Sequence, residues 1–508
     1  MNPFLSARKL TAIAYVIIVA LQLYTHLGSN ANGHDLLSVV IELPGASNDC
    51  DCTITQVENN AVSPCTTTIG IVDTVSSASG FQTAINTANS TGGFRTILIA
   101  NGTYQVASTA WYPYITASDI VIRSLSGNRD SVILTGTGMA DVSPGTEIGI
   151  YAVGDNITIA DLTIKEVGNH GVAVTGENLF VHNVRIQDTY EQMIKGNASN
   201  GGADSGRVQC SLFEYTAGIG PQWYIGGLDI HNGDDWIVRD NVFKDIESPS
   251  AAVAEHAIHF WNSSSNNLVE RNVIINCDRG IGFGLGSSPN DGGLIRNNMI
   301  YNDGTGVFDD VGIGLETSPN TKVYNNTIFI AYPNAIEYRF PATTNVEITN
   351  NLTNKLIKSR DGGTAILITN YTSAADSLFV DVAAGNLRLI EHNPLVVDQG
   401  TEIVDVSLDI DQTPRPQGFT YDIGGHEFKC DTLAVNMWIG PGTGNWNDNI
   451  SNWSLNRLPT FCDQVMIGSG VTVYLSNAES GVAYSVQVAS GAQLVVETNG
   501  VLSVLSDE

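Results

Sequence analysis

Basic and aromatic side chains recur in short, strand-like segments in the middle of this sequence. The segments QMIK (192–195), GLDIH (227–231) and HAIHFW (256–261) carry the residues Lys195, Asp229, His231, His256, His259 and Trp261. Histidine can transfer protons near neutral pH, lysine can neutralise an anion, and an aromatic ring can stack on a ligand. These residue types, repeated in successive segments, indicate one site that handles an anionic ligand.

The segments belong to a longer repeat that contains the pattern apolar-x-x-Asn-apolar. The pattern occurs in NITIADLTI (156–164), NLFVHNVRI (178–186), RVQCSLF (207–213), WIVRDNVF (236–243), NLVERNVII (267–275), LIRNNMI (294–300), KVYNNTIF (322–329) and VEITNNL (346–352). The expected pivot residues recur every 22 to 31 residues and are Asp161, Asn183, Ser211, Asn241, Asn272, Asn298, Asn326 and Asn351. Such a period predicts a solenoid, and period-2 runs between Gly, Asn and Asp turns favour a β-helix. Asparagine at a pivot tolerates a left-handed backbone and can hydrogen-bond to its neighbour in a stacked ladder.

Each repeat also contributes a second strand, and these second strands can be aligned with one another. If Leu228, Ile258, Ile281, Ile313 and Ile336 stack inward, alternation along each strand directs another set of residues outward. The outward set is Asp229 and His231, His259 and Trp261, Gly282 and Gly284, Gly314 and Glu316, and Glu337 and Arg339, with Lys195 one repeat earlier. We therefore expect an outer wall with His, Lys and Trp at one end, bare glycines in the middle, and Glu and Arg at the other end.

The longest repeats lie between Asn183 and Asn272, so their extra residues must leave the solenoid as loops. One loop, residues 214–224, carries Trp223 and Tyr224, and Arg279 falls beside the same region. Loops on a rigid scaffold are where functional sites tend to lie. The loop and the outer wall are therefore expected to form one site.

Composition limits the classes of function. The 508 residues include 52 Asp and Glu against 23 Lys and Arg, a formal net charge of −29. Such a field repels phosphate backbones and argues against nucleic acid as a partner. Fifty-one glycines, together with many Asn, Ser and Thr, favour an all-β, turn-rich fold.

Four parts are expected along the chain. Residues 1–31, with Arg8 and Lys9 before a short apolar run, have the layout of a secretory signal peptide, and a retained membrane anchor is the alternative. Residues 32–70 form a linker or cap, residues 71–428 the β-helix, and residues 429–508 a small β-module. We expect a secreted or cell-surface monomer, extracellular or periplasmic, with no membrane contact beyond that possible anchor.

Two segments have composition of their own. Phe81, Ile85 and Ala88 stand near helical spacing in residues 80–90, which predicts a short helix that caps the open end of the β stack. The C-terminal module carries Trp438, Trp446 and Trp453, which could stack on sugars or pack in a core.

Seven cysteines are few for a secreted chain of this length, so the fold cannot depend on a dense disulfide framework. Cys50, Cys52 and Cys65 could supply one local bridge. No His/Cys cluster accompanies their Cys-x-Cys spacing, and we do not predict zinc there.

With this repeat, residues 70–426 resemble the right-handed parallel β-helix family of pectate lyases, polygalacturonases and related polysaccharide lyases. The resemblance ends with DQTPRPQG (411–418) and YDIGGHEF (421–428), a closing pattern of secreted bacterial β-helix proteins. It implies a right-handed parallel β-helix of the pectin-lyase-like type that acts on a polysaccharide. It is specific for the fold and weak for the chemistry.

The resemblance makes β-elimination from a uronic-acid polymer the expected reaction. A base removes the C5 proton, a cation neutralises the carboxylate, and an acid can protonate the leaving oxygen. The candidates are His231 or His259 as base, Lys195 and Arg279 as neutraliser or acid, and Tyr224 as proton donor. Substrate-binding candidates are Trp223, Trp261, Asp229, His256, Glu316 and Arg339, and bound Ca²⁺ is an alternative neutraliser.

Two other functions stay open. A β-helix hydrolase would use the carboxylates Asp229, Asp234 and Asp235. The segment GLDIHNGDDW lacks the Gly-His-Gly and Arg-x-Lys segments of polygalacturonases, and no aspartate ladder with Arg-x-Pro-x-x-Arg matches the calcium-dependent pectate lyases. The third possibility is a non-catalytic glycan-binding or adhesin-type surface protein.

Overall fold

The computed structural model describes residues 50–106, 111–143, 147–197, 202–252, 255–390 and 392–505. The predicted signal segment, residues 1–31, lies outside the described residues, as do residues 32–49 of the expected linker. None of the described helices has the length and apolar character needed to cross a membrane.

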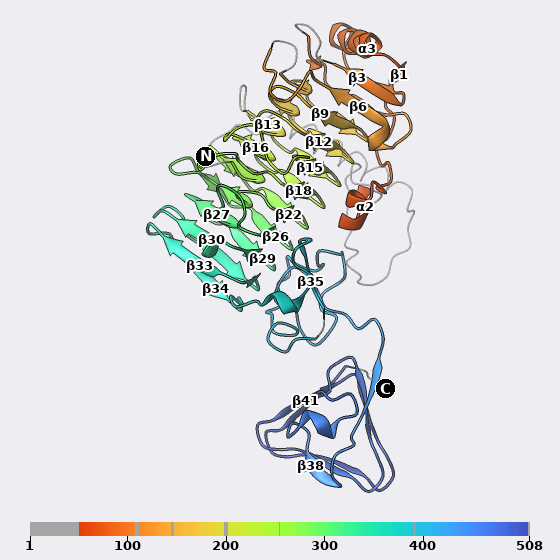
Figure 1. Cartoon of the computed structure of the whole chain (residues 1–508), viewed down its shortest axis with the longest axis vertical. Helices are drawn as coiled ribbons and strands as arrows, with labels where there is room; N and C mark the ends of the chain where they lie inside the picture. The colour runs from red at the N-terminus through yellow and green to blue at the C-terminus, as the bar shows by residue number, and fades with distance from the viewer. Residues whose placement is uncertain are drawn as a thin grey trace, which may run out of the picture. The chain divides into compact units, whose positions relative to one another are not determined.

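Three long parallel sheets form the main body, and successive turns of the chain add one strand to each (Figure 1). Within the described residues, sheet A has 12 strands, in the order β1 (Ile71–Val75), β2 (Arg95–Ile99), β5 (Ile120–Ser124), β8 (Ile157–Ala160), β11 (Phe180–His182), β14 (Arg207–Gln209), β17 (Ile237–Arg239), β21 (Leu268–Glu270), β25 (Leu294–Arg296), β28 (Lys322–Tyr324), β31 (Val346–Thr349) and β34 (Ala365–Ile368). Sheet B has 10, in the order β3 (Gly102–Gln105), β6 (Val132–Thr135), β9 (Thr163–Lys165), β12 (Arg185–Gln187), β15 (Leu212–Glu214), β18 (Val242–Lys244), β22 (Val273–Ile275), β26 (Met299–Asn302), β29 (Thr327–Ile330) and β32 (Leu352–Thr353).

Sheet C, the third face, also has 10 described strands. They are β4 (Tyr114–Ile115), β7 (Ile150–Ala152), β10 (Val172–Val174), β13 (Ile194–Gly196), β16 (Leu228–His231), β19 (Ile258–Trp261), β23 (Ile281–Phe283), β27 (Ile313–Glu316), β30 (Asn334–Arg339) and β33 (Leu356–Arg360). Aliphatic and aromatic residues of all three sheets form one continuous buried core. The right-handed parallel β-helix predicted from the repeat is confirmed.

A ladder of asparagine side chains runs along the turn between sheets A and B. Neighbouring amides hydrogen-bond at 2.9–3.0 Å through Asn241, Asn272, Asn298, Asn326, Asn351 and Asn370. Each amide also donates to a core-facing backbone carbonyl, as Asn298 does to Val269 at 3.0 Å. The predicted stacking of asparagines is confirmed, and the ladder fixes the register between turns.

The position of the left-handed residue in this turn corrects the expected pivots. It is the residue before the ladder, with φ of 50–57° at Cys210, Asp240, Arg271, Asn297, Asn325 and Asn350. Asp161 and Asn183 are themselves left-handed, with φ of 56° and 52°, so in those turns the ladder position falls one residue later. Two adjacent polar turn residues look alike in a sequence, but only one bends the backbone while the next turns its amide into the core.

Helix α3 (Ala78–Thr91) packs against the first strands of the β-helix. Ser77 caps its N-terminus by accepting a hydrogen bond from the Gly80 N–H at 3.0 Å. Its buried side chains, Phe81, Ala84, Ile85 and Ala88, join the core of the first turns. The predicted cap helix is confirmed, and it covers apolar residues that an open end would expose.

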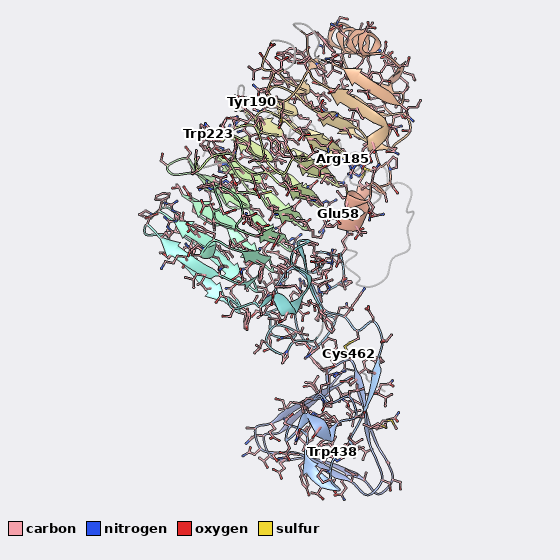
Figure 2. All side chains as sticks on the ribbon, in the orientation of Figure 1. Glu58, Arg185, Tyr190, Trp223, Trp438 and Cys462 are labelled. Atoms are coloured by element: carbon pink, nitrogen blue, oxygen red, sulfur yellow. A yellow bond between two sulfur atoms is a disulfide. The ribbon has the colours of Figure 1, made fainter. Side chains whose placement is uncertain are left out.

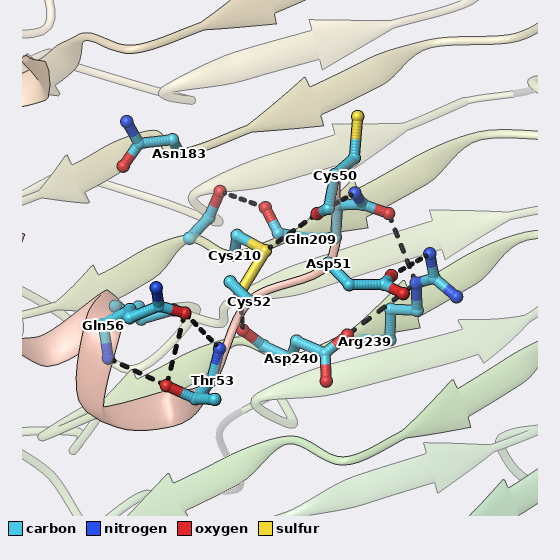
Figure 3. The surroundings of a disulfide bond; sticks show 12 residues. Cys50, Asp51, Cys52, Thr53, Gln56, Asn183, Gln209, Cys210, Arg239 and Asp240 are labelled. Atoms are coloured by element: carbon cyan, nitrogen blue, oxygen red, sulfur yellow. Dashed lines mark hydrogen bonds and ion pairs between the residues drawn. A yellow bond between two sulfur atoms is a disulfide. The ribbon is translucent and has the colours of Figure 1, made fainter. Parts of the chain in front are cut away.

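The chain before α3 is tied to the outside of the β-helix. A short helix, α2 (Ile54–Glu58), begins with a capping box between Thr53 and Gln56. Cys50 pairs with Cys65, which confirms the expected local bridge. Figure 3 shows a second disulfide, between Cys52 and Cys210, that joins this segment to the turn after β14 across 158 residues of chain.

The segment after β34 folds back along the outside of the β-helix, where it packs against sheet B and the turn between sheets A and B. Strands β35 (Phe379–Asp381) and β36 (Asn386–Leu389) form an antiparallel pair. In the motif that follows, Arg415 and Glu427 form a fully buried ion pair with a 2.5 Å contact. Arg415 also donates to the Gly424 carbonyl at 2.8 Å, and Gly424 N–H bonds to Asn350 of the β-helix. The sequence pattern that marks the end of the repeat therefore has a structural role: it anchors this segment to the side of the β-helix.

The C-terminal module is itself a small parallel solenoid. Its strands are β37 (Ala434–Met437), β38 (Thr443–Asn445), β39 (Asp463–Ile467), β40 (Thr472–Leu475), β41 (Ser480–Ala483), β42 (Ser485–Val488), β43 (Gln493–Val496) and β44 (Val501–Val504), and all their pairings are parallel. Trp438, Trp446 and Trp453 are buried in its core, with ring centroids 4.8 and 5.2 Å apart. Core packing, the second of the two expected uses, therefore holds for all three, and none offers an open stacking surface for sugars.

Four carboxyl groups, those of Glu247, Asp278, Asp303 and Asp309, lie in the loops that follow β18, β22 and β26, and Asp278 is buried. Burial, with the charges of Asp309 and Asp303, raises the pKa of Glu247 to about 7. Burial, with the charges of Glu247 and Asp309, raises the pKa of Asp278 to about 8 against the opposing effects of the Ser248 N–H and Arg279. The folded protein therefore holds protons that the unfolded chain releases at lower pH.

This difference predicts that the Asp278→Asn variant becomes more stable than the wild type as pH rises. Because the folded pKa lies above the unfolded one, the wild type has its full stability at acid pH and loses it as the pH rises through 8. Urea unfolding should show the variant close to the wild type at low pH and more stable by about 6 kcal/mol at alkaline pH, since the pKa is raised from 3.8 to about 8 and each pKa unit corresponds to about 1.4 kcal/mol. The exposed Asp431→Asn change is the control and should show no such trend; a parallel pH dependence in wild type and Asp278→Asn would contradict the prediction.

Candidate functional site

Strands β13, β16 and β19 of sheet C lie side by side and bring the candidate residues into register. Lys195 pairs with Asp229, which pairs with His259. His231 pairs with Trp261 in the next outward row. The predicted inward residues also align and are fully buried: Leu228, Ile258, Ile281, Ile313 and Ile336. Parallel pairing thus makes neighbours of residues from separate turns.

Lys195 is the centre of a polar cluster. Its ammonium donates to the Asp229 carboxylate in a short hydrogen bond, to His231 Nε2 at 2.9 Å and toward Tyr224 Oη at 3.5 Å. Burial lowers the pKa of Lys195, but the charge and hydrogen bond of Asp229 outweigh that effect and raise it. The structure thus places a fixed cation within reach of a histidine and a phenol.

Asp229 is fully buried and surrounded by donors. Besides Lys195, the Trp261 indole donates to Asp229 Oδ1 at 2.7 Å, and His259 Nδ1 lies 3.8 Å away. Burial alone would raise the pKa of Asp229, but the polar contact with His231 and the charge of Lys195 hold it well below its usual value. Asp229 is therefore a permanent anion that orients its neighbours and has no proton to give.

His231 is the more accessible of the two candidate bases, with 19% of its side chain exposed. Because an ammonium can only donate, His231 Nε2 accepts from Lys195 and the ring carries its proton on Nδ1. The edge of its ring lies against Trp261, with centroids 4.3 Å apart. In this tautomer His231 presents its Nε2 lone pair to the Lys195 ammonium.

His259 is fully buried, and both ring nitrogens face oxygen atoms. Nδ1 lies 2.7 Å from Glu255 Oε2, and Nε2 lies 3.2 Å from the Gly284 carbonyl. Its ring stacks on Trp261 at 5.4 Å and lies 4.4 Å from the His256 ring. These contacts and the complete burial of the ring leave neither nitrogen of His259 open to a substrate that approaches from solvent.

The expectation of bare glycines in the middle of the wall is wrong at Gly282. A Cβ atom at Gly282 would lie 2.5–2.7 Å from three ring atoms of His256. Glycine is needed there because the His256 ring lies flat on the strand. His256 is itself buried, and burial lowers its pKa well below the usual value for histidine.

The structure does not bring the remaining charged candidates into the Lys195 cluster. Arg279 pairs with Asp310 through contacts of 2.9 Å. Farther along sheet C, Glu316 pairs with Arg339 at 2.8 Å and also accepts from the Gly286 N–H at 2.7 Å. These residues are tied to one another, and the outer wall carries its charge in fixed pairs.

The loop after β15 carries the aromatic candidates toward sheet C. Gln222 holds it in place by donating to the Tyr190 and Tyr224 carbonyls at 3.0 Å each. Trp223 is 51% exposed, and Figure 2 shows it, with Tyr190, on the side of the molecule formed by sheet C. Of the candidate residues, Trp223 offers the most open stacking surface.

Asp234 and Asp235 lie in the turn between β16 and β17, away from the outward row of Asp229. The Asp234 N–H donates to Asp204 at 2.9 Å, and Asp235 has a left-handed backbone with φ of 58°. The three carboxylates thus do not form one cluster: Asp229 is held by Lys195 and Trp261, and Asp234 Oδ1 is buried without a hydrogen-bond partner among the described residues.

Sequence reasoning missed three residues near this cluster. Glu255 contacts His259, and His170 lies 3.8 Å from Glu191 one turn before Lys195. Burial and the charge of Lys195 lower the pKa of His170 to about 4. Glu255 stands next to His256 in the sequence, but its contact depends on the course of a loop that no periodicity predicts.

Comparison with known proteins gives one family and a set of folds. The model of a family described as Periplasmic copper-binding protein (NosD) matches residues 224–376. A pectate lyase, Pel9A, is 15% identical and superposes with a TM-score of 0.46 over 67% of this chain and 90% of its own. An alginate lyase from Paenibacillus sp. str. FPU-7 is 17% identical, with a TM-score of 0.41 over 60% of this chain and 99% of its own. An endo-xylogalacturonan hydrolase from Aspergillus tubingensis is 11% identical, with a TM-score of 0.33 over 60% of this chain and 96% of its own. No curated protein matches the sequence.

The chain's own sheets define its class. It is a right-handed parallel β-helix protein, with a cluster of basic, acidic and aromatic residues on the outer face of sheet C. Its three disulfides are typical of proteins of extracytoplasmic compartments.

Proposed function

We propose that sheet C binds a uronic-acid-containing polysaccharide and cleaves it by β-elimination. The observation that carries this proposal is the contact of Lys195 with His231 and Tyr224. A cation, a neutral base and a proton donor within one set of contacts are the groups that the reaction needs. The exposed Trp223 beside them supplies a surface for a sugar ring.

Lys195 neutralises the substrate carboxylate. Removal of the C5 proton builds negative charge on that carboxylate, and a nearby ammonium stabilises the charge as it develops. Asp229 keeps the ammonium protonated and in place, so the cation is ready before substrate binds. The buried setting strengthens this interaction relative to water.

His231 is the base that the contacts favour. It is partly exposed, whereas His259 is buried with both nitrogens engaged. When the Lys195 ammonium turns to the substrate carboxylate, the His231 Nε2 lone pair is released to take the C5 proton. Trp261 limits the tilt of the imidazole ring from one side.

Tyr224 completes the reaction as the acid. Burial raises the pKa of Tyr224, so the phenol holds its proton until the leaving oxygen O4 develops charge. The C5–H and C4–O4 bonds break, a C4=C5 double bond forms, and O4 takes the phenol proton. Lys195 contacts both His231 and Tyr224 and can pass the proton back, which restores the starting state.

The carboxylates of this face do not fit Ca²⁺. Calcium takes six to eight oxygen ligands, but Asp229 faces Lys195, Glu316 faces Arg339, and Glu337 faces Arg360 at 2.6 Å. Each carboxylate is thus paired with a cation, and the proposed steps use none of them as a calcium ligand.

Absorbance near 235 nm tests the proposal, since it reports the unsaturated uronate that elimination leaves. The full chain would be incubated with polygalacturonate, polymannuronate, polyguluronate and a glucuronate polymer, together with the His231→Ala variant. We expect a rise on at least one polymer with wild type and its loss with His231→Ala. New reducing ends without absorbance would indicate hydrolysis, and silence in both assays would indicate binding alone; either result would overturn the proposal.

A further inference from the structure

In the contact between His259 and Glu255, a ring nitrogen and a carboxylate oxygen lie close together, and at least one positive charge or proton is needed between them. If His259 Nε2 donates to the Gly284 carbonyl, Nδ1 presents a lone pair to Glu255 Oε2 only 2.7 Å away. Asp229 Oδ1 adds further negative charge 3.8 Å from the same nitrogen. A positive centre must lie among these atoms, either a proton or a metal ion.

His256 distinguishes these two possibilities. It is 3% exposed, and its Nδ1 is buried with no hydrogen-bond partner. Ligand atoms of Glu255, His256 and His259 all lie within 4.8 Å of one another. A proton on His259 would satisfy Glu255 and leave His256 without a partner, whereas a metal ion would take ligands from all three.

We propose that Glu255, His256 and His259 bind one divalent transition-metal ion. Two imidazole nitrogens and one carboxylate suit Zn²⁺ or Cu²⁺, whereas Ca²⁺ prefers oxygen ligands alone. The hydrogen bond from His259 Nε2 to the Gly284 carbonyl is the kind of outer contact that orients a metal-ligating histidine. Three protein ligands leave a further position for water or an exogenous ligand.

Glycines on sheet C make room for this site. Gly282 lies under the His256 ring. On the next strand, a Cβ atom at Gly314 would lie 3.7 Å from His256 Nε2. Any side chain at Gly282 would push the imidazole away from Glu255 and His259. The proposed elimination uses Lys195, His231 and Tyr224, and the ion would be bound by Glu255, His256 and His259, so the two sets of acting residues differ although Asp229 lies beside both. Absorbance at 235 nm and metal titration therefore test the two functions separately.

A second group with metal-like spacing serves as the internal comparison. Asp409, Asp411 and His426 also lie within 4.8 Å of one another. Their ligand atoms already have protein partners: Arg388 donates to Asp411 at 2.6 and 2.7 Å, backbone N–H groups donate to Asp409, and the Leu389 N–H donates to His426. This group is complete without an ion.

The test uses the full chain, stripped with a chelator and titrated with Zn²⁺ or Cu²⁺ by calorimetry. We expect one ion per chain that millimolar Ca²⁺ does not displace, and a loss of affinity of about a hundredfold or more in Glu255→Gln and in His256→Ala. The matched control, His426→Asn, should bind the ion as wild type does. Far-UV circular dichroism would establish that each variant is folded.

Electron paramagnetic resonance of bound Cu²⁺ provides a measurement that needs no variant. Hyperfine splitting from two nitrogen ligands is expected in the wild type, and from one in His256→Ala if it folds. A wild-type chain that binds no stoichiometric ion, a Cu²⁺ spectrum without histidine nitrogens, or loss of the ion in His426→Asn alone would each overturn the proposal.

Discussion

The Lys195→Met variant is expected to lose the proposed elimination, with kcat reduced by about a thousandfold or more. Methionine keeps the length and apolar stem of lysine but removes the charge that faces the substrate carboxylate. It also removes the donor that holds His231 Nε2 and approaches Tyr224. Because base, acid and cation meet at this one ammonium, no other single substitution in the cluster should cost more.

Lys358 provides the matched control. It stands in the same outward row of sheet C, on β33, opposite Glu337 in the strand register. Its side chain is exposed. Lys358→Met changes the net charge by the same amount and should leave kcat within about twofold. Initial rates at 235 nm on the active polymer would measure both variants. Similar losses in the two variants would mean that Lys195 acts through general charge, and an active Lys195→Met would remove it from the mechanism.

The Asn298→Leu variant is expected to be the most destabilising change in the scaffold. Asn298 Oδ1 accepts from the Asn272 N–H and amide, and its own amide donates to Val269, Arg296 and Asn326. Leucine leaves those buried groups without partners, and each costs about 1–3 kcal/mol. We expect a loss of about 4 kcal/mol in the free energy of unfolding.

Urea denaturation followed by circular dichroism would measure this loss. Asn298→Ser should recover part of it, because Ser211 occupies the same ladder position and its hydroxyl accepts from the Val184 N–H at 3.1 Å. The exposed helix residue Asn86 gives the control, and Asn86→Leu should not lower stability. A variant Asn298→Leu as stable as the wild type would show that packing alone holds the turns in register.

The sequence by itself determined the solenoid, its inward residues and its outer wall. The reason is that a parallel stack repeats the same environment at every turn. The alternation of inward and outward residues along one strand therefore predicts which residues point inward on all the strands of that sheet. The alternation therefore places Leu228, Ile258 and Ile281 in one inward row, and the proximity of Lys195 to His231 follows from the same alignment. The asparagine ladder was predictable for the same reason, apart from a shift of one residue in its first turns.

Only the tertiary structure decided what the loops do. Glu255 and His256 reach His259 through a loop whose course no repeat dictates, and the disulfide between Cys52 and Cys210 joins residues 158 apart. The pairing of Arg279 with Asp310 removed a cation that the sequence had placed at the site. Periodicity constrains strands because neighbouring turns share hydrogen bonds, whereas a loop residue takes its partner from whichever side chains the folded surface presents.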